Sequence, residues 1–585
     1  MKNEKKMLSG NEAIARGAYE AGAICGFAYP GTPSTEILEN FVTYPQVTAE
    51  WAPNEKVALE LGVGSALTGA RTLVTMKHVG LNVAADPLFT SAYIGVKGGL
   101  VIVTADDPNM YSSQNEQDNR HYARATKIPM LEPSDSQEAK EFTKKAFEIS
   151  EEFDVPVFLR ETTRIAHSKA IVEINDKKKL TREYLFERDP QKYVMIPGYA
   201  RKRHEILENN FMKLKKWAED SDLNKEEMIS KDLGIITSGI VYQYVKEVFP
   251  DASVLKLGMT FPVPEQLIKQ FSEKVKKLYV IEELDKILTQ EILAMGISFE
   301  MIELPTRGEI DVDVLRKNFH LMQLTLEPVS DLAPRPPALC PGCPHRALFT
   351  VLKKHKYIVN GDIGCYTLGV LPPLSAMDTC LDMGAGVNMA QGMVTANPDM
   401  ASKVVSVIGD STFLHSGITG LLNAVYNKKA TTILILDNRI TAMTGFQENP
   451  SSGYTLDGTK SLEMDFKSLA LALGVKKENV RETNGFDIKE VESVLKEESS
   501  KKAVSVIINK GACALLKREN TLHKKPLFVK KDECISCHLC LNVGCSSLIK
   551  DVDGKVIIDS KTCNGCEVCM QVCPPKAIKK QEAEG

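Results

Sequence analysis

The sequence predicts an α/β protein in which several doubly wound parallel sheets precede a small, cysteine-rich α+β domain. Short apolar runs such as 100–104 and 156–160 end in polar or turn residues and alternate with helical stretches. This alternation is typical of parallel sheets wrapped by helices. Residues 534–573 differ, because they hold eight of the 14 cysteines of the chain. A length of 585 residues allows about three to five domains.

Changes in composition divide the chain into six parts. A lysine-rich stretch interrupts the alternation after the first sheet, and we expect its charges to face solvent in a helical insertion. A proline-rich stretch without periodicity follows the second sheet and is typical of a linker. The expected parts are an α/β unit, the insertion, a smaller α/β unit, the linker, a third α/β unit and the cysteine-rich module, at residues 1–175, 176–230, 231–327, 328–339, 340–522 and 523–585.

Composition excludes some classes of function. With 43% apolar and 25% charged residues, the chain has the composition of an ordinary globular protein. A net charge of −4 argues against a nucleic-acid partner, which calls for a basic face. Neither a signal peptide nor an apolar run of bilayer length is visible. We therefore expect a chain of the reduced, oxygen-poor cytoplasm, without disulfides.

The cysteines of 534–573 form two groups with the spacing of iron–sulfur ligands. The second group, C-x2-C-x2-C-x3-C-P, is the bacterial two-cluster ferredoxin pattern, whose fourth cysteine binds the other cluster. The first group has one extra residue before Cys545, and Ser546 stands in place of proline. Two structural zinc sites are the alternative, since C-x2-C pairs also make zinc ribbons. The crossing rule predicts two [4Fe-4S] clusters, one held by Cys534, Cys537, Cys540 and Cys573 and the other by Cys563, Cys566, Cys569 and Cys545.

A second constellation follows two apolar runs of the third unit. The runs 404–408 and 432–436 are predicted to be buried parallel strands. Their carboxyl ends share the edge of the sheet where ligands bind. Asp410 follows the first run, and Asn438 and Ile440 follow the second. A carboxylate, an amide oxygen and the backbone carbonyl of Ile440 can then bind one Mg²⁺, which prefers oxygen ligands and shares them with phosphates.

The residues beside Asp410 fit a phosphate group. Gly409 lets a diphosphate approach the backbone closely, and we expect the following helix to begin near His415. Taken alone, a Gly-Asp pair after a strand is equally explained by a turn and a helix cap. Joined to the second strand end, it resembles the thiamine-diphosphate motif, GDG followed at a distance by NN. Ser411 stands at the third position of GDG and Asp437 at the first asparagine, while the two metal-binding positions are kept.

A thiamine site also needs a glutamate that hydrogen-bonds the aminopyrimidine ring, and the first unit offers Glu55. This residue opens a predicted helix rich in Ala, Gly and Leu. An apolar setting raises the pKa of a carboxyl group, as proton exchange with a ring nitrogen near neutral pH requires. Glu60 lies close by in the sequence. The alternative is an ordinary first-turn glutamate, favoured by the helix dipole.

Five longer segments carry a more specific resemblance, at residues 29–37, 77–88, 106–124, 340–347 and 361–370. They resemble the 2-oxoacid:ferredoxin oxidoreductases, and within that family the α subunits that act on indolepyruvate. The resemblance covers essentially the whole chain. It implies α/β domains with doubly wound parallel sheets of thiamine-diphosphate-enzyme type, plus a C-terminal two-cluster ferredoxin-like α+β domain. It assigns pyrimidine-binding, transketolase-C-terminal-like and diphosphate-binding domains to 1–175, 231–327 and 340–522.

Family members with a cluster beside the thiamine imply a third iron–sulfur site. They bind it through a C-x2-C pair, a cysteine in a glycine-containing turn and a distant fourth cysteine. The cysteines that match in this order are Cys340, Cys343, Cys365 and Cys513. Alternatively, the first two are buried thiols of a core. We expect Cys25 and Cys380 to be core residues.

The resemblance also implies a reaction. Thiamine diphosphate attacks the keto carbon of a 2-oxoacid and absorbs the electrons of decarboxylation. Two electrons then pass one at a time to the clusters, and coenzyme A removes the acyl group as a thioester. A cation, best an arginine fork, suits the substrate carboxylate, and the candidates are Lys77, His78, Arg120 and Arg124. Further candidates for contacts with cofactor or substrate are Thr32, Ser34, Gly364, Gly409 and Ser411.

Partners and substrate follow from the same resemblance. It implies a smaller β subunit, with an αβ heterodimer that dimerises, and ferredoxin as electron acceptor. The implied substrates are coenzyme A and an aryl 2-oxoacid, of which indolepyruvate is the first candidate. Pyruvate, a branched-chain 2-oxoacid or 2-oxoglutarate are alternatives. Two other classes stay open: a non-oxidative thiamine decarboxylase or carboligase with structural clusters, and an electron-transfer subunit whose thiamine site has decayed.

Overall fold

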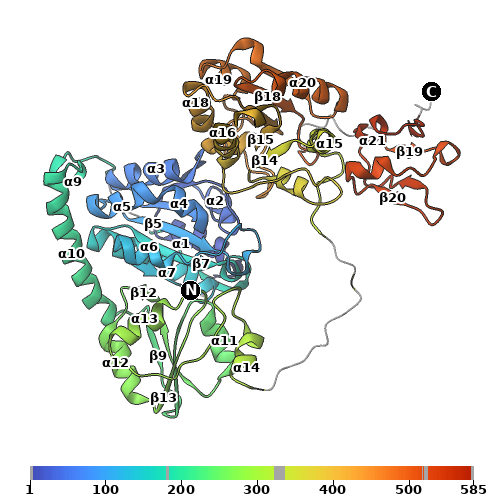
Figure 1. Ribbon diagram of the computed structural model, residues 1–585. Helices are drawn as coiled ribbons and strands as arrows, with labels where there is room; N and C mark the ends of the chain where they lie inside the picture. Colours follow the sequence, from blue (N-terminus) through green and yellow to red (C-terminus); the bar gives the residue numbers. More distant parts are fainter. Residues whose placement is uncertain are drawn as a thin grey trace. The chain divides into compact units, whose positions relative to one another are not determined.

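A computed structural model describes residues 4–178, 183–321, 332, 336–516, 518 and 525–581. The chain divides into two units, Met1–Pro328 and Val329–Gly585, called unit 1 and unit 2 below (Figure 1). No helix in the described ranges is both long and apolar enough to cross a membrane. Parts of the expected linker, insertion and cysteine-rich module lie outside the described residues, at 328–331, 333–335, 179–182, 523–524 and 582–585.

Unit 1 is built around a seven-stranded sheet in which every strand except β12 runs parallel to its neighbours. β4, β5 and β7 are buried along their whole length, which explains their near-continuous apolar sequence. The order is β12-β6-β7-β5-β4-β2-β3, with bounds Met259–Phe261, Met130–Leu131, Val157–Thr162, Leu100–Asp106, Thr72–Lys77, Cys25–Ala28 and Thr48–Trp51.

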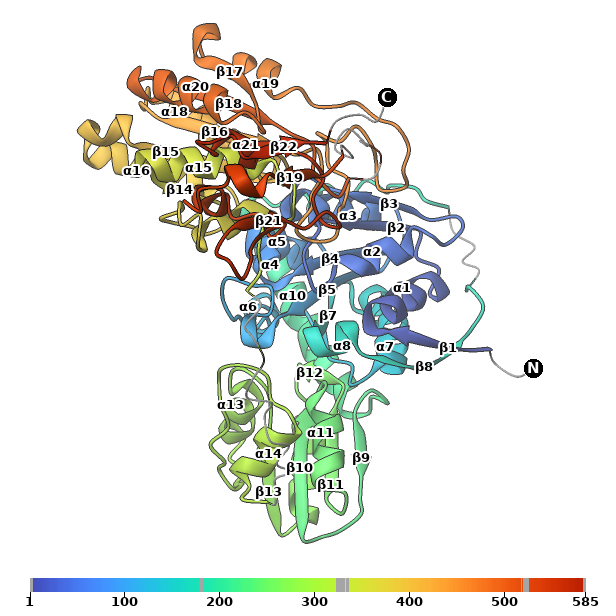
Figure 2. The same ribbon diagram turned by 90° about the vertical axis from the view of Figure 1, so that its right-hand side faces the viewer.

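Helices cover both faces of this sheet. One face carries α1 (Gly10–Glu20), α2 (Thr35–Phe41) and α7 (Ser136–Phe153), and the other carries α3 (Glu55–Leu67), α4 (His78–Val83) and α5 (Ala85–Ile94) (Figures 1 and 2). The side chains of Ser9 and Asp135 cap α1 and α7. The short helices α6 (Arg120–Thr126) and α8 (Thr163–His167) lie in the connections after β5 and β7, and β1 (Glu4–Ser9) pairs antiparallel with β8 (Lys169–Ile174).

A second sheet completes unit 1. Its order is β13-β10-β11-β9, with bounds Lys277–Ile281, Leu233–Ser238, Ser253–Leu257 and Lys225–Glu227. Helices α11 (Val241–Val248) and α14 (Val312–Asn318) share a core with one face, while α12 (Glu265–Lys274) and α13 (Ile287–Ala294) share a core with the other (Figure 1). The strands expected from the apolar runs of this region are therefore present.

The charged stretch expected as an insertion contains α9 (Pro190–Tyr193) and the 23-residue α10 (Pro197–Glu219). Most of the side chains of α10 are exposed or half-buried, as its lysines indicate. The end of the stretch differs from a solvated insertion, because β9 pairs with β11 of the second sheet. β12, from the region of the second sheet, pairs in turn with β6 of the first. Such edge pairings join distant segments and leave no local pattern in sequence.

Unit 2 contains a five-stranded parallel sheet in the order β14-β15-β16-β18-β17. The strands span Ile358–Asn360, Val404–Gly409, Thr432–Asp437, Ser505–Lys510 and Val480–Asn484. One core contains residues of α15 (His345–His355) and α20 (Ile488–Ser500), and the core of the other side contains residues of α16 (Ala385–Ala396), α18 (Ile418–Tyr426) and α19 (Phe466–Ala472).

The cysteine-rich end of unit 2 forms two antiparallel ribbons around short helical turns. β19 (Leu527–Val529) pairs with β22 (Ile578–Lys580), and β20 (Leu548–Lys550) pairs with β21 (Val556–Ile558). Helix α21 (Val568–Gln571) and the 3₁₀ turn Leu539–Val543 lie between them in sequence. Val543 and Val568 join the core of the parallel sheet's α15 side. The module is thus packed against the five-stranded domain rather than tethered to it.

Two glycines of α3 give a matched test of this packing. A Cβ on Gly62 would clash with the side chain of Val74, whereas a Cβ on Gly64 meets no atom within 4 Å. We expect Gly62→Ala to destabilise α3 by about 1–3 kcal/mol through overpacking. Gly64→Ala should stabilise it by about 0.5–1 kcal/mol, because alanine has the higher helix propensity. Hydrogen exchange of the α3 amides measures both, and equal effects of the two variants would contradict the packing.

Candidate functional site

The carboxyl ends of β15 and β16 bring Asp410 and Asn438 together. The strands are parallel neighbours with Gly409 opposite Leu436. The backbone N–H groups of Asn438 and Arg439 donate to Asp410 Oδ2 at 3.2 and 2.7 Å. Asn438 Oδ1 accepts from the N–H of Ile440 at 3.1 Å. The predicted juxtaposition of the two strand ends is therefore present.

The helix after β15 begins at Asp410 itself, not near His415 as expected. α17 (Asp410–Thr412) continues through a π-helical turn, Phe413–Gly417, into α18. The N–H of Ser411 donates to Asp410 Oδ1 at 2.6 Å. The carboxylate thus satisfies a free N–H of its own first turn, which an apolar periodicity does not reveal.

Burial makes this edge of the sheet a favourable place for a cation. Burial, followed by the charge of Asp437, raises the pKa of Asp410 to about 7. Burial also raises the pKa of Asp437 to about 6. Asp437 Oδ1 is buried without a hydrogen-bond partner among the described residues. Two neighbouring carboxyl groups that resist ionisation in the metal-free chain can both ionise when a cation compensates them.

Sequence reasoning missed three polar residues of this edge. Asp362, after β14, accepts from the N–H groups of Gly384 at 2.9 and 3.0 Å and of Gly386 at 3.1 Å, and burial raises its pKa to about 7. Ser451 Oγ donates to Asp410 Oδ2 at 3.2 Å, and to Asn449 Oδ1 at 2.6 Å. Asp362 lies in one of the segments that carry the resemblance, so the sequence offered a signal that could have identified it. The 449–451 loop had none.

Two glycines of the site lie against one aromatic ring. A Cβ on Gly409 would lie 2.8 Å from the ring of Tyr366, and a Cβ on Gly364 would clash with the same ring. Tyr366 is buried, and its hydroxyl donates to the carbonyl of Ile363 at 3.0 Å. Both glycines therefore make room for an aromatic ring on their Cβ sides, and the approach of a diphosphate to the backbone of Gly409 stays a prediction. Ser411 lies beside them, with its Oγ accepting from Thr441 Oγ1 at 3.0 Å.

The third cysteine set borders the Asp410 site. Burial, then the charges of Cys513 and Cys340, raises the pKa of Cys365 to about 11. Burial raises the pKa of Cys343 to about 12, and Cys365 and Cys340 contribute. The N–H of Cys513 donates to the carbonyl of Asn438 at 3.1 Å, and the charge of Asp410 raises the pKa of Cys513 and Cys365. These four thiols are thus electrostatic neighbours of one another and of the strand-end site.

The crossing-rule assignment of the other eight cysteines stays a prediction, and the charges that act on Cys540 and Cys569 are compatible with it. Burial, then the charges of Cys573, Cys537 and Cys534, raises the pKa of Cys540. Burial, then the charges of Cys566, Cys545 and Cys563, raises the pKa of Cys569. A cavity is lined by this second set together with Pro341, Gly342 and Arg346. No three His, Cys, Asp or Glu side chains of the described chain are placed to hold a single metal ion.

Two cysteines remain outside these sets. Cys25 is half-buried at the start of β2, and its pKa is raised by burial. Cys380 is exposed, in the loop between β14 and α16. The expectation that Cys380 is a core residue is wrong, because Cys380 is exposed directly after Thr379, which pairs with Asn360 at the edge of the sheet.

In unit 1, Glu55 and two of the cationic candidates gather at the start of α4. Glu55 is the first residue of α3 and is buried. A Cβ on Gly80 would lie 2.5 Å from Glu55 Oε1, so the carboxylate lies against α4. His78 is fully buried, its Nε2 lies 3.2 Å from the carbonyl of Asn115, and its Nδ1 has no partner among the described residues.

Lys77 lies between two loops of the same edge. Its Nζ donates to the carbonyl of Ser112 at 2.7 Å, and Ser112 Oγ donates to the carbonyl of Thr32 at 3.2 Å. Burial lowers the pKa of Lys77 to about 8, while the charge of Asp107 opposes this. The structure thus brings Thr32 and Lys77 together, although Thr32 contributes its carbonyl rather than its hydroxyl. Ser34 is buried and donates to the carbonyl of Gly31 at 2.9 Å.

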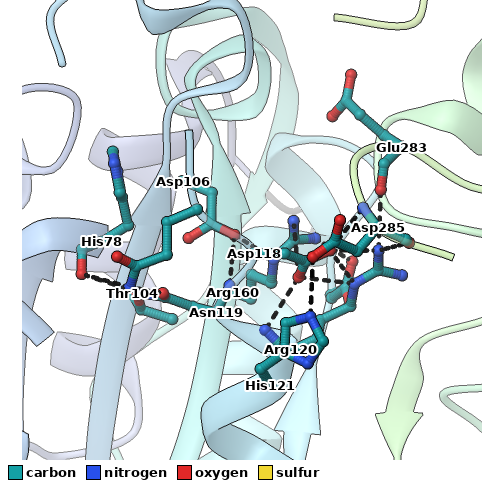
Figure 3. Close-up of polar contacts among 12 residues, drawn as sticks. His78, Thr104, Asp106, Asp118, Asn119, Arg120, His121, Arg160, Glu283 and Asp285 are labelled. Carbon is teal, nitrogen blue, oxygen red and sulfur yellow. Dashed lines mark hydrogen bonds and ion pairs between the residues drawn. The ribbon is translucent and has the colours of Figure 1, made fainter. Parts of the chain in front are cut away.

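Arg120 is committed to a buried ion network between the two sheets of unit 1. Its guanidinium donates to Asp118 at 2.6 Å, to Glu282 at 2.7 Å and to the backbone carbonyls of Glu283 and Asp285 at 2.9 and 2.8 Å. Figure 3 shows Arg120 between Asp118 and the segment that carries Glu283 and Asp285. Arg160 continues the network, donating to Asp106 at 2.7 Å and to Glu132 at 2.8 Å. The expectation that Arg120 receives a substrate carboxylate is therefore corrected, because its donors are already occupied.

Arg124 also has an acidic partner in the second sheet domain. It pairs with Glu291 of α13 at 3.0 Å, and both side chains are partly exposed. Together the two arginines connect α6 to the second sheet domain. Sequence alone shows their charge but not the pairing with Glu282 and Glu291, which lie more than 160 residues further along the chain.

Comparisons with known proteins agree with this geometry. Residues 16–226 match the family described as pyruvate flavodoxin/ferredoxin oxidoreductase, thiamine diphosphate-binding. Residues 362–509 match the C-terminal TPP-binding domain of thiamine pyrophosphate enzymes, and residues 556–579 match a 4Fe-4S binding domain. The last match decides against zinc for the cysteines that it covers.

Full-length relatives decide the family. Indolepyruvate oxidoreductase subunit IorA of Methanothermobacter thermautotrophicus is 39% identical, over 99% of this chain and 98% of the relative. The proteins of the same name from Archaeoglobus fulgidus and Thermococcus kodakarensis are 39% and 38% identical, over 98% of this chain and 97% of each relative. The chain belongs to the indolepyruvate oxidoreductase subunit IorA family.

Membership in the IorA family confirms the expected class of enzyme, a thiamine-diphosphate-dependent 2-oxoacid:ferredoxin oxidoreductase. It also confirms the fold class and the use of thiamine diphosphate and [4Fe-4S] clusters. The match to a solved 2-oxoglutarate:ferredoxin oxidoreductase from Magnetococcus marinus covers 54% of this chain and 65% of the solved chain, with 16% identity and a TM-score of 0.46. This similarity is too low to support an argument.

The two arginines of α6 give a matched prediction. Arg120→Ala leaves the buried Asp118 and Glu282 without their cation, and we expect a local destabilisation of about 3–5 kcal/mol. Arg124→Ala removes a partly exposed pair and should cost about 0–1 kcal/mol. Hydrogen exchange of residues 118–126 and 282–292 is the suitable measurement, because a multidomain chain does not unfold in two states. Similar losses in both variants would show that the network does not stabilise the junction.

Proposed function

We propose that this chain carries out oxidative decarboxylation of an aryl 2-oxoacid, indolepyruvate first, with coenzyme A, yielding an aryl-acetyl-CoA and CO2 and reducing ferredoxin. The name of the relatives supports indolepyruvate as substrate. The observation that carries the proposal is the contact between two candidate sites in unit 2. The N–H of Cys513 donates to the carbonyl of Asn438, and Asp410 acts electrostatically on Cys365 and Cys513. A diphosphate site next to thiols that bind an electron acceptor suits an oxidative reaction better than a simple decarboxylation.

Asp410, Asn438 and the carbonyl of Ile440 are the proposed ligands of Mg²⁺, which would bind the cofactor's diphosphate. Their support is the meeting of the two strand ends, the burial of Asp410, and the neighbouring Asp437 Oδ1, which is buried without a hydrogen-bond partner among the described residues. When bound, thiamine diphosphate supplies the electron sink for decarboxylation. The protein's part is placement: Gly364, Gly409 and Ser411 border the site around Tyr366.

Unit 1 carries its own candidates for contacts with an aminopyrimidine ring and with a substrate. Glu55 is the candidate partner of the aminopyrimidine ring, supported by its burial against Gly80. Lys77 and His78 are the candidates for the substrate carboxylate, and Thr32 lies in the same contact group as Lys77. A buried lysine with a lowered pKa and a histidine with an unpartnered nitrogen both gain from an anionic ligand. Arg120 and Arg124 take no part.

Three [4Fe-4S] clusters are proposed to carry the electrons, and their ligand sets form a series. The set Cys340, Cys343, Cys365 and Cys513 lies next to Asp410. The second set lines a cavity with Pro341 and Gly342, which lie beside Cys340 of the first set; its members are Cys545, Cys563, Cys566 and Cys569. The charge of Cys540, from the last set, raises the pKa of Cys569. Cys537, in the last set with Cys534 and Cys573, is exposed. Electrons can therefore leave toward a soluble acceptor at that end.

The proposed partners are a smaller β subunit and ferredoxin, in an αβ heterodimer that dimerises. The word "subunit" in the names of the relatives supports the first. Co-expression with the smaller subunit under anaerobic conditions, with iron, sulfide and thiamine assays, tests the composition. A panel of 2-oxoacids with coenzyme A and ferredoxin tests the reaction. CO2 release without coenzyme A and without ferredoxin reduction would instead establish a non-oxidative enzyme.

Two carboxylates at the same edge give a matched prediction for the cofactor site. Asp410→Ala removes a proposed metal ligand and should weaken Mg²⁺-dependent binding of thiamine diphosphate by about 100-fold or more. Asp437→Asn introduces the asparagine of the NN motif beside Asn438 and should retain binding. Titration calorimetry with thiamine diphosphate and Mg²⁺ measures both. Tight binding by the Asp410 variant would remove the metal site from the proposal.

A further inference from the structure

Arg346 is a buried cation that the reaction described above does not use. It is the second residue of α15, it is 1% exposed, and it is among the largest fully buried side chains of the chain. Its Nη1 donates to the carbonyls of Val543, at 3.2 Å, and of Gly544. Its Nη2 donates to the carbonyls of Cys340, at 3.0 Å, and of Leu339. One guanidinium thus joins two loops that are about two hundred residues apart in sequence.

This guanidinium has no carboxylate partner in the described part of the chain. No acidic side chain there lies within ion-pair distance of it, and its Nε is buried without a hydrogen-bond partner. Arg120 and Arg160, the comparable buried arginines of unit 1, each contact two carboxylates at 2.8 Å or less. Carbonyl dipoles alone compensate a buried charge poorly, so such a cation calls for an anion nearby.

The neighbours of Arg346 indicate where that anion is. Its two pairs of carbonyls flank the cysteines of two different sets, Cys340 in one and Cys545 in the other. Its charge lowers the pKa of Cys343 and Cys566, one thiol from each set, against the effect of burial. It also lines the cavity of the second set, with Cys545, Cys563, Cys566 and Cys569. The guanidinium therefore lies between the two sets of thiols.

Glycines make this close approach possible. Gly544 has a left-handed φ of 72°, and a Cβ there would lie 3.3 Å from Arg346 Nη1. Gly342 has a φ of 73°, and a Cβ there would collide with Asn564 of the second set's loop. Both loops are thereby shaped to meet at the guanidinium.

We propose that Arg346 is the shared counter-charge of two neighbouring [4Fe-4S] clusters and raises the reduction potential of both. This rests on the proposed third cluster at Cys340, Cys343, Cys365 and Cys513. Each cluster takes up one electron from the substrate's oxidation and gains one negative charge, without a proton. A fixed positive charge in a dry site favours that reduced form. Arg346 is thus a positioning and tuning residue, and it touches no substrate.

The test compares two substitutions in the full αβ holoenzyme. Arg346→Gln removes the charge and keeps a hydrogen-bonding side chain, while Arg346→Lys keeps the charge but cannot fork to four carbonyls. Arg481→Gln is the control, because Arg481 pairs with Glu497 on the surface of β17. Midpoint potentials come from redox titration followed by electron paramagnetic resonance. We expect Arg346→Gln to weaken one-electron reduction of both clusters about tenfold, that is, to lower their potentials by about 59 mV, and the other two variants to keep the wild-type potentials.

The outcomes separate this inference from the proposal beneath it. About twelve irons in the wild-type chain establish the three clusters, and about eight would refute the third cluster itself. With iron content unchanged, equal potentials in wild type and Arg346→Gln overturn the role of Arg346. If Arg346→Gln fails to bind iron, the Arg346→Lys variant distinguishes a counter-charge from a purely structural role. Full iron and unchanged potentials in the lysine variant support the counter-charge, whereas loss of iron in both variants shows that Arg346 only ties two loops together.

Discussion

The constraint on which the candidate site depends is the shared carboxyl edge of two neighbouring parallel strands. β15 and β16 end side by side, and this alone makes Asp410 and Asn438 neighbours although they are 28 residues apart. Both strands are buried, so their ends form a dry edge at which a carboxylate is reluctant to ionise. A divalent cation removes that cost and at the same time attracts a diphosphate. In the proposed site, one group of atoms would therefore serve both cofactor binding and local electrostatic balance.

Sequence could predict those parts of the molecule that local pattern determines. The buried strands, the glutamate that opens α3 and the spacing of the cysteines all follow from short-range rules. The roles of Arg120 and Arg124 could not be predicted, because an arginine shows its charge in sequence but not the partner that occupies it. The contact of Tyr366 with Gly364 and Gly409 could not be predicted either, since a glycine motif does not show which group approaches it. The start of the helix at Asp410 was not predicted, because its N-cap is Gly409 and no capping side chain marks the boundary in the sequence.

Buried arginines have two different uses in this chain. Arg120 and Arg160 are surrounded by carboxylates contributed by segments before and after the second sheet, so their charge is cancelled within the protein. Such a network joins two domains and has no charge left for a ligand. Arg346 contacts only carbonyl groups, so its charge remains available. Whether a buried cation is structural or functional is therefore decided by its partners and not by its depth.

The same reasoning applies to the thiols of the cysteine-rich module. Its apolar core is small, made of residues such as Leu527, Leu548, Val556 and Ile578, and two of its buried members are Cys540 and Cys569. A module of this size rarely folds on apolar burial alone and commonly needs a metal group as a staple. Burial raises the pKa of these thiols, so the metal-free module holds them neutral, and cluster binding must release their protons. The proposed clusters would thus also be part of the core of the module, which packs against the five-stranded domain of unit 2, and loss of iron should remove the relay and its scaffold together.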